Sequence, residues 1–280
     1  MSSVLEIINA GTGYLEKRGI EDARRNMQML LAHQLGCRRI DLYVQFDRLL
    51  EEAQLVPLRE ALKKRGEGLP LQHLLGSVIF HGREFLCDNR ALIPRPETEE
   101  LAGLFLETVP WRDGMRVLDV GCGSGVLGLT IAAEQPLAVV VMADISADAL
   151  DLARENAARL GLDRVAFVQS DLFEAVEGEY DLIIANLPYV PLAEKETLSR
   201  EVRHDPEAAL FGGEDGMDII RRFVPDAARR LRPGGTVAME IGHGQASQTV
   251  ALLESCGLAG VRVLRDLSGT ERFPIATLAS

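Results

Sequence analysis

A short glycine-rich segment, Asp119-Val120-Gly121-Cys122-Gly123-Ser124-Gly125, restricts the fold of this 280-residue sequence more than any other feature. It follows an apolar run at residues 117–120 and precedes a helical pattern at 126–134. Glycine lets the backbone turn sharply, and it lets a ligand approach the peptide plane where a Cβ would block it. The pattern therefore predicts a strand, a ligand-binding turn and a helix in succession.

Short apolar runs alternate with helical patterns from Arg116 onward. This alternation predicts βαβ units and an α/β fold with a seven-stranded, mostly parallel, doubly wound sheet, in which ligands bind beyond the carboxyl ends of the strands. Helices are expected at 147–160 and 219–231. The strands are expected at 117–120, 139–143, 165–169, 182–185, 236–241, 261–264 and 274–278.

The first 75 residues have helical spacing instead. One helix is expected to begin near Glu21 and end near Gly36, and another to run over 57–64. Short apolar pieces with Gly82 between them predict a β-hairpin over 78–92. The expected organisation is a helical bundle at 1–75, a hairpin linker at 76–98 and a larger domain at 99–280.

The charge distribution argues against nucleic acid as the partner. Residues 1–99 hold 14 basic and 14 acidic side chains, so the whole net charge of −12 falls on the part with the glycine-rich turn. The four cysteines are scattered and the five histidines lack metal-binding spacing, so neither a disulfide framework nor a metal is expected. The absence of a signal-peptide pattern and of a long apolar run predicts a cytoplasmic protein without a membrane anchor.

Two further segments extend the ligand-binding pattern. Asp144 closes the next expected strand, where a carboxylate can accept both ribose hydroxyls of a nucleoside. Asp171 and Leu172 follow the third strand. Because residues 123–128 also fit the G-x-G-x-x-G dinucleotide fingerprint, the residues alone leave open an NAD-dependent oxidoreductase.

The D-x-G-x-G-x-G form of the turn resembles motif I of class I methyltransferases, in which the Asp119 carboxylate would face the cationic amino acid part of S-adenosylmethionine. The resemblance implies that Asp171 accepts the adenine amine, that Leu172 covers the ring, and that Cys122 is a small filler residue. S-adenosylhomocysteine would be the product. The cofactor-binding residues are then expected to be Gly121, Cys122, Gly123, Ser124, Gly125, Asp144, Asp171, Leu172 and Asn186.

The expected catalytic loop is Asn186-Leu187-Pro188-Tyr189, directly after a buried strand. The Asn186 side-chain oxygen and the Leu187 carbonyl can each accept one N–H of a substrate NH₂ group, which orients the nitrogen and stabilises its developing charge. Pro188 stiffens the loop, and Tyr189 can stack on a planar amide. The loop resembles the (N/D)-P-P-(Y/F/W) signature of methyltransferases that act on planar NH₂ groups, and Leu187 departs from it because proline is the norm there.

Segments along most of the chain resemble the release factor glutamine methyltransferases (the PrmC or HemK family). They include Leu92-Ile93-Pro94-Arg95-Pro96-Glu97-Thr98-Glu99, residues 209–216 and Glu240-Ile241-Gly242-His243-Gly244-Gln245. The resemblance implies N5-methylation of the glutamine in a Gly-Gly-Gln tripeptide, by a monomer whose helical domain recognises the release factor.

Three alternatives stay open. A nucleic-acid adenine N6-methyltransferase shares motif I and the N-x-P-Y loop, but it predicts a basic catalytic face. A ribosomal-protein glutamine methyltransferase usually has P-R-S-P in place of the segment at 94–97. A scaffold on a degenerate methyltransferase fold would not need intact Gly121, Asp144 and Asn186.

Overall fold

A computed structural model describes residues 2–279, which form two compact units. The first unit contains the chain up to Ser77 together with Ser199–His204. The second contains Val78–Leu198 and the chain from Asp205 onward. The chain therefore passes from one unit to the other three times.

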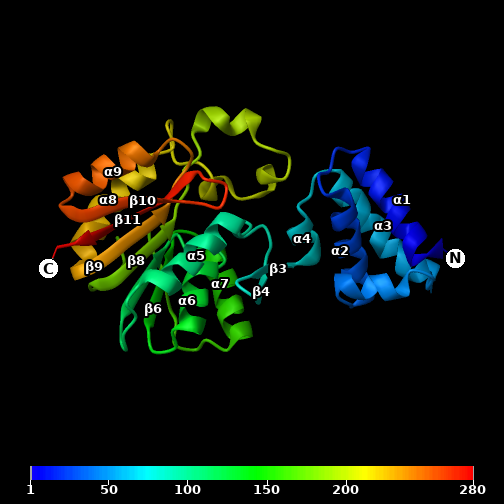
Figure 1. The fold of residues 1–280 in the computed structure, drawn as a ribbon, viewed down its shortest axis with the longest axis horizontal. Helices are drawn as coiled ribbons and strands as arrows, with labels where there is room; N and C mark the ends of the chain where they lie inside the picture. The colour runs from blue at the N-terminus through cyan, green and yellow to red at the C-terminus, as the bar shows by residue number, and fades with distance from the viewer. Residues whose placement is uncertain (1, 280) are drawn as a thin grey trace. The chain divides into compact units, whose positions relative to one another are not determined.

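The first unit is a helical bundle around an apolar core that includes Ile8, Leu31 and Leu42 (Figure 1). A two-residue ribbon that the sequence did not predict pairs β1 (Ser2–Ser3) with β2 (Leu49–Leu50). The helices are α1 (Val4–Glu16), α2 (Ala23–Leu35), the 3-10 helix η1 (Arg39–Gln45), α3 (Glu52–Gly66) and α4 (Leu71–Leu75).

Helix α3 begins five residues before the expected start at Pro57. Proline favours the first turn of a helix, which suggested that start, but Pro57 lies inside α3. The Gln54 side chain instead accepts a hydrogen bond from the Glu51 backbone N–H at 3.1 Å, which caps the helix earlier. The guanidinium of Arg65, in the last turn of α3, is buried, and it donates to Asn26 at 2.7 Å and to Glu201 at 2.6 Å.

The second unit contains the expected seven-stranded sheet, in the order β10-β11-β9-β8-β5-β6-β7. All neighbouring pairs among β9, β8, β5, β6 and β7 are parallel, and only β11 runs antiparallel to its neighbours. This confirms the predicted α/β class. The strands are β5 (Arg116–Val120), β6 (Val139–Asp144), β7 (Ala166–Gln169), β8 (Tyr180–Asn186), β9 (Leu231–Glu240), β10 (Leu258–Arg265) and β11 (Glu271–Leu278).

Helices cover both faces of this sheet (Figure 1). Residues of α5 (Pro96–Thr108), α6 (Val126–Glu134) and α7 (Ala147–Leu160) pack in one apolar core. Residues of α8 (Asp218–Arg230) and α9 (Ala246–Ser255) pack in a second core on the other face. Short 3-10 helices η2 (Leu192–Thr197), η3 (Val202–His204) and η4 (Glu207–Ala209) follow β8. Within residues 2–279, no helix is long and apolar enough to cross a membrane.

The expected hairpin is formed by β3 (Ser77–Phe80) and β4 (Arg83–Leu86). Its two turn residues, His81 and Gly82, both have positive φ, at 46° and 73°, as a type I′ turn requires. Phe80 and Phe85 are buried in the core under α5, with their rings edge to face. From Val78 onward the hairpin therefore belongs to the second unit.

Candidate active site

The loops after β5, β6, β7 and β8 enclose a cavity of about 410 Å³ in the second unit. Parallel strands end at the same edge of a sheet, which is why residues so far apart in the chain meet there. Ten of the twelve expected site residues line the cavity, and Gly125 and Tyr189 do not. The ten are Gly121, Cys122, Gly123, Ser124, Asp144, Asp171, Leu172, Asn186, Leu187 and Pro188.

The glycine-rich turn is held in a shape that only glycine fits easily. Gly121 has a φ of 69°, and a Cβ there would lie 2.8 Å from Cδ2 of Leu187. Gly125 has a φ of 87°, and a Cβ there would lie 2.8 Å from Cε of Met142. The glycine at 121 thus keeps the turn close to the loop after β8, whereas the one at 125 allows α6 to pack on the sheet.

Asp144 fastens the turn to the end of β6. Its Oδ2 accepts a hydrogen bond from the Gly123 backbone N–H at 2.8 Å, and its Oδ1 accepts one from Ser146 at 2.9 Å. Burial raises the pKa of Asp144, and these backbone bonds oppose the increase. The carboxylate therefore shapes the turn as well as lining the cavity.

Asp119 presents a buried acceptor without a partner. Its Oδ2 accepts from the Gly128 backbone N–H at 2.8 Å, while its Oδ1 has no hydrogen-bond partner among residues 2–279. Burial raises the pKa of Asp119 to about 7. A cationic ligand group in the cavity would satisfy this oxygen and favour the ionised form.

Asp171 and Leu172, after β7, also line the cavity. Leu172 has a φ of 49°, a left-handed conformation that is uncommon for a residue with a Cβ. Asp171 accepts a hydrogen bond from Arg222 at 2.7 Å, and Arg222 also lines the cavity. The cavity wall at Asp171 thus carries a paired carboxylate.

Asn186 is held by a buried polar chain that the sequence analysis did not assign. The Asn186 Nδ2 donates to Thr98 Oγ1 at 2.9 Å, and Thr98 Oγ1 donates to Glu240 Oε2 at 2.8 Å. The other carboxylate oxygen, Oε1, accepts from the Tyr189 hydroxyl at 2.9 Å. Burial raises the pKa of Glu240, opposed by these two hydroxyl bonds and by the charge of Arg272.

Tyr189 does not line the cavity, and neighbouring segments hold its backbone oxygen in place. Gln245 Nε2 donates to its backbone oxygen at 2.9 Å, and Gln245 Oε1 accepts from the Gly242 N–H at 2.8 Å. A Cβ on Gly216 would lie 2.2 Å from the same Tyr189 oxygen. The segments at 209–216 and 240–245 therefore hold the end of the loop. Stacking of Tyr189 on a substrate amide remains a prediction.

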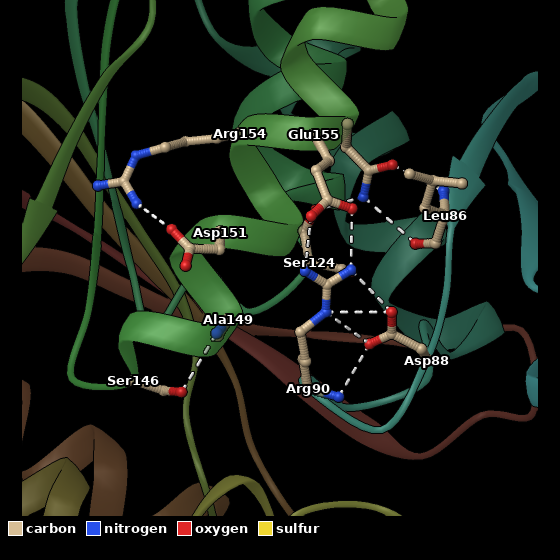
Figure 2. Close-up of polar contacts among 10 residues, drawn as sticks. Leu86, Asp88, Arg90, Ser124, Ser146, Ala149, Asp151, Arg154 and Glu155 are labelled. Atoms are coloured by element: carbon tan, nitrogen blue, oxygen red, sulfur yellow. Dashed lines mark hydrogen bonds and ion pairs between the residues drawn. The ribbon is translucent and has the colours of Figure 1, made fainter.

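The segment before α5 is anchored by two arginines. Arg95 forms an ion pair with the fully buried Asp205 at 2.5 Å, and Asp205 also accepts from the Ile93 N–H at 3.0 Å. Arg90 bridges Asp88 and Glu155, at 2.8 and 2.7 Å (Figure 2). Both arginines line the cavity, so these contacts hold part of its wall in place.

Comparison with known proteins finds methyltransferase relatives over nearly the whole chain. The Methyltransferase small domain family matches residues 97–210, and the PrmC N-terminal domain family matches residues 6–76. A release factor glutamine methyltransferase from Deinococcus radiodurans is 40% identical over 96% of both chains. One from Rhodopirellula baltica is 38% identical over 97% of this chain and 95% of that protein.

The chain belongs to the release factor glutamine methyltransferase family. The resemblance drawn from the sequence is thereby confirmed. Among solved structures, a methyltransferase from Pyrococcus furiosus superposes with a TM-score of 0.55 at 19% identity, covering 71% of this chain and 91% of that one. A ribosomal protein L11 methylase from Lactobacillus delbrueckii subsp. bulgaricus gives 0.51 at 23%, covering 68% and 82%. These two likenesses support the fold.

Thr98 and Glu240 are among the residues at this site to which the sequence analysis gave no role. Both lie in segments that carried the family resemblance, Pro94-Arg95-Pro96-Glu97-Thr98-Glu99 and 240–245, which was the available signal. Thr98 lies 88 residues from Asn186 and 142 residues from Glu240 in the sequence, so local spacing could not predict these contacts. No group of side chains within residues 2–279 is arranged to hold a metal ion.

Asp119 should give the ligand-free protein a distinctive pH dependence. Its carboxyl stays protonated in the folded chain up to about pH 7 but ionises near pH 4 when unfolded, so the folded state binds more protons between these values. The free energy of unfolding should therefore fall as pH rises. Relative to Asp119→Asn, which lacks this titration, it should fall by about 2–3 kcal/mol between pH 5 and pH 7.

Urea unfolding of both proteins across this range measures the difference directly. Other titrating groups are common to both proteins, so they cancel. A difference that is independent of pH would contradict the buried, unpartnered state of Asp119.

Proposed function

We propose that the protein methylates the side-chain amide nitrogen, N5, of the glutamine in the Gly-Gly-Gln tripeptide of peptide chain release factors, with S-adenosylmethionine as methyl donor. The observation that carries this proposal is a single cavity lined both by the Gly121–Gly123 turn and by Asn186, Leu187 and Pro188. The names and nearly full-length coverage of the relatives support the substrate.

The residues present fit the cofactor. The glycine turn lines the cavity with residues 121–123, and the Oδ1 of Asp119, which accepts no hydrogen bond from the described residues, suits a cationic ammonium group. Asp144 and Leu172 line the cavity, where Asp144 would accept ribose hydroxyls and Leu172 would cover an adenine ring. When bound, S-adenosylmethionine supplies an electrophilic methyl group and leaves as S-adenosylhomocysteine.

The loop after β8 would prepare the substrate amide. An amide nitrogen is a poor nucleophile because its lone pair is delocalised into the carbonyl group. Asn186 Oδ1 and the Leu187 carbonyl would each accept one N–H, which orients the nitrogen and stabilises positive charge as it develops. No general base is needed during transfer, since the methylated nitrogen sheds its proton readily afterwards.

Leu187, which stands where the resemblance expects proline, has a packing role of its own. Its side chain is buried, and its Cδ2 fills the space that a Cβ on Gly121 would need. The leucine thus joins the substrate loop to the cofactor turn. This contact would hold the loop where proline would otherwise stiffen it, and the carbonyl needed for the substrate is a backbone group.

Peptide mass spectrometry tests the proposed activity. Unmethylated release factor incubated with this protein and S-adenosylmethionine should gain one methyl group, on the glutamine of Gly-Gly-Gln. A release factor with that glutamine replaced should gain none. Absence of the methyl group, with cofactor binding confirmed, would refute the substrate and direct the search to ribosomal proteins and rRNA.

Gly121→Ala should separate cofactor binding from backbone strain. Its matched control is Gly161→Ala, because Gly161 has the same φ of 69° but open space around its Cβ position. Both variants should lose about 1 kcal/mol of stability from the left-handed backbone, and Gly121→Ala should lose more because its Cβ would press on the buried Leu187. Only Gly121→Ala should weaken S-adenosylmethionine binding in calorimetry, by at least about tenfold (~1.4 kcal/mol). Equal affinities of the two variants for S-adenosylmethionine would contradict the proposed role of the glycine turn in cofactor binding.

The helical unit is proposed to bind the release factor outside the tripeptide. Its 3-10 helix η1 exposes Ile40, Tyr43 and Val44, of which Val44 is 87% accessible. Apolar and aromatic side chains at a surface are typical of protein interfaces. The protein is further proposed to act as a monomer in the cytoplasm. Its substrate would be a protein, and it would not bind DNA directly.

A further inference from the structure

We infer that Thr98 and Glu240 are positioning residues that fix which way the Asn186 side-chain amide faces. The inference rests on the proposed function, because it concerns how Asn186 presents itself to a substrate NH₂ group. It starts from the chain of hydrogen bonds from Asn186 through Thr98 to Glu240, at 2.9 and 2.8 Å.

Three separate elements build this chain. Asn186 and Glu240 end the adjacent parallel strands β8 and β9 and are paired in register. Thr98 lies in the first turn of α5, two residues after Pro96, with which the helix begins. Thr98 and Glu240 are 3% and 1% exposed, so water does not compete for their hydrogen bonds.

The direction of the hydrogen bonds follows from the carboxylate. Glu240 accepts from two hydroxyl groups, those of Thr98 and Tyr189, so the Thr98 hydroxyl gives its one proton to Glu240. The Thr98 oxygen can then only accept a hydrogen bond from Asn186, so Asn186 must direct its NH₂ group toward Thr98. The remaining end of the Asn186 amide, its Oδ1, is turned away from Thr98 and is left to accept.

This orientation decides whether Asn186 can serve the reaction. A glutamine NH₂ group offers two donors, so the loop must present two acceptors, Asn186 Oδ1 and the Leu187 carbonyl. A flipped Asn186 would set its own NH₂ against that of the substrate and lose one acceptor. Asparagine oxygen and nitrogen have nearly the same shape, so packing alone does not prevent the flip.

Glu240 also holds the far end of the loop. Its Oε1 accepts from the Tyr189 hydroxyl at 2.9 Å, while its Oε2 accepts from Thr98. The buried Glu240 carboxylate thus accepts hydrogen bonds from two hydroxyl groups. One belongs to Thr98, which binds Asn186 at the start of the loop, and the other belongs to Tyr189 at its end. The two acceptors for the substrate lie between these anchored points.

Thr98→Val and Thr98→Ser test the inference. Valine keeps the shape of threonine and removes its hydroxyl, whereas serine restores the hydroxyl. Thr98→Val should lower kcat for release factor at least about 30-fold. Its KM and its affinity for S-adenosylmethionine should stay within about threefold, and Thr98→Ser should recover most of kcat.

Thr130→Val is the matched control. Thr130 is a fully buried threonine in α6 whose hydroxyl has no hydrogen-bond partner among the described residues, so valine there should leave kcat unchanged. Wild-type kcat in Thr98→Val, or a Thr98→Ser variant as slow as Thr98→Val, would overturn the inference. An inactive wild-type protein would instead refute the proposed function.

A second measurement does not depend on any substrate. In NMR spectra, the Asn186 side-chain NH₂ protons of the wild type and of Thr130→Val should exchange with solvent slowly, because they are donated to Thr98. Thr98→Val should speed this exchange at least about tenfold. Equal exchange in all three proteins would overturn the inference even if the natural substrate were different.

Discussion

The parallel pairing of β5 with β8 is the interaction on which the rest of the site depends. Val120 pairs with Ala185, so Gly121 and Asn186 leave the sheet side by side. The side chain of Leu187 then packs against the glycine turn. A cofactor segment and a substrate segment more than 60 residues apart in sequence are thereby set in contact by backbone hydrogen bonds of the sheet core.

The features that the sequence could predict are those written in local patterns. The seven strands, the hairpin and the glycine turn depend on neighbouring residues, and all of them were found, although β9 begins at Leu231, five residues before the expected start and at the last residue of the expected helix 219–231. The start of α3 was wrong because Pro57 is tolerated inside that helix while Glu51 and Gln54 cap it earlier.

The polar chain behind the catalytic loop could not be predicted in the same way. Thr98 looks like an ordinary residue of a helix start, and Glu240 like the polar end of a strand. Only the sheet order, which sets β9 beside β8, and the packing of α5 bring both to Asn186. The same holds for Ser199–His204, which joins the helical unit through the contact of Glu201 with the buried guanidinium of Arg65. Such contacts depend on topology, which local spacing does not encode.

The central claim is that Asn186 acts on the substrate amide much more than on cofactor binding. Single-turnover quench-flow with Asn186→Ala, enzyme in excess over release factor, tests it most directly. The rate of methyl transfer should fall by about 10²–10³ while S-adenosylmethionine binds within about threefold of the wild-type affinity. A variant that transfers methyl at the wild-type rate, or that loses cofactor affinity as much as it loses rate, would contradict the account.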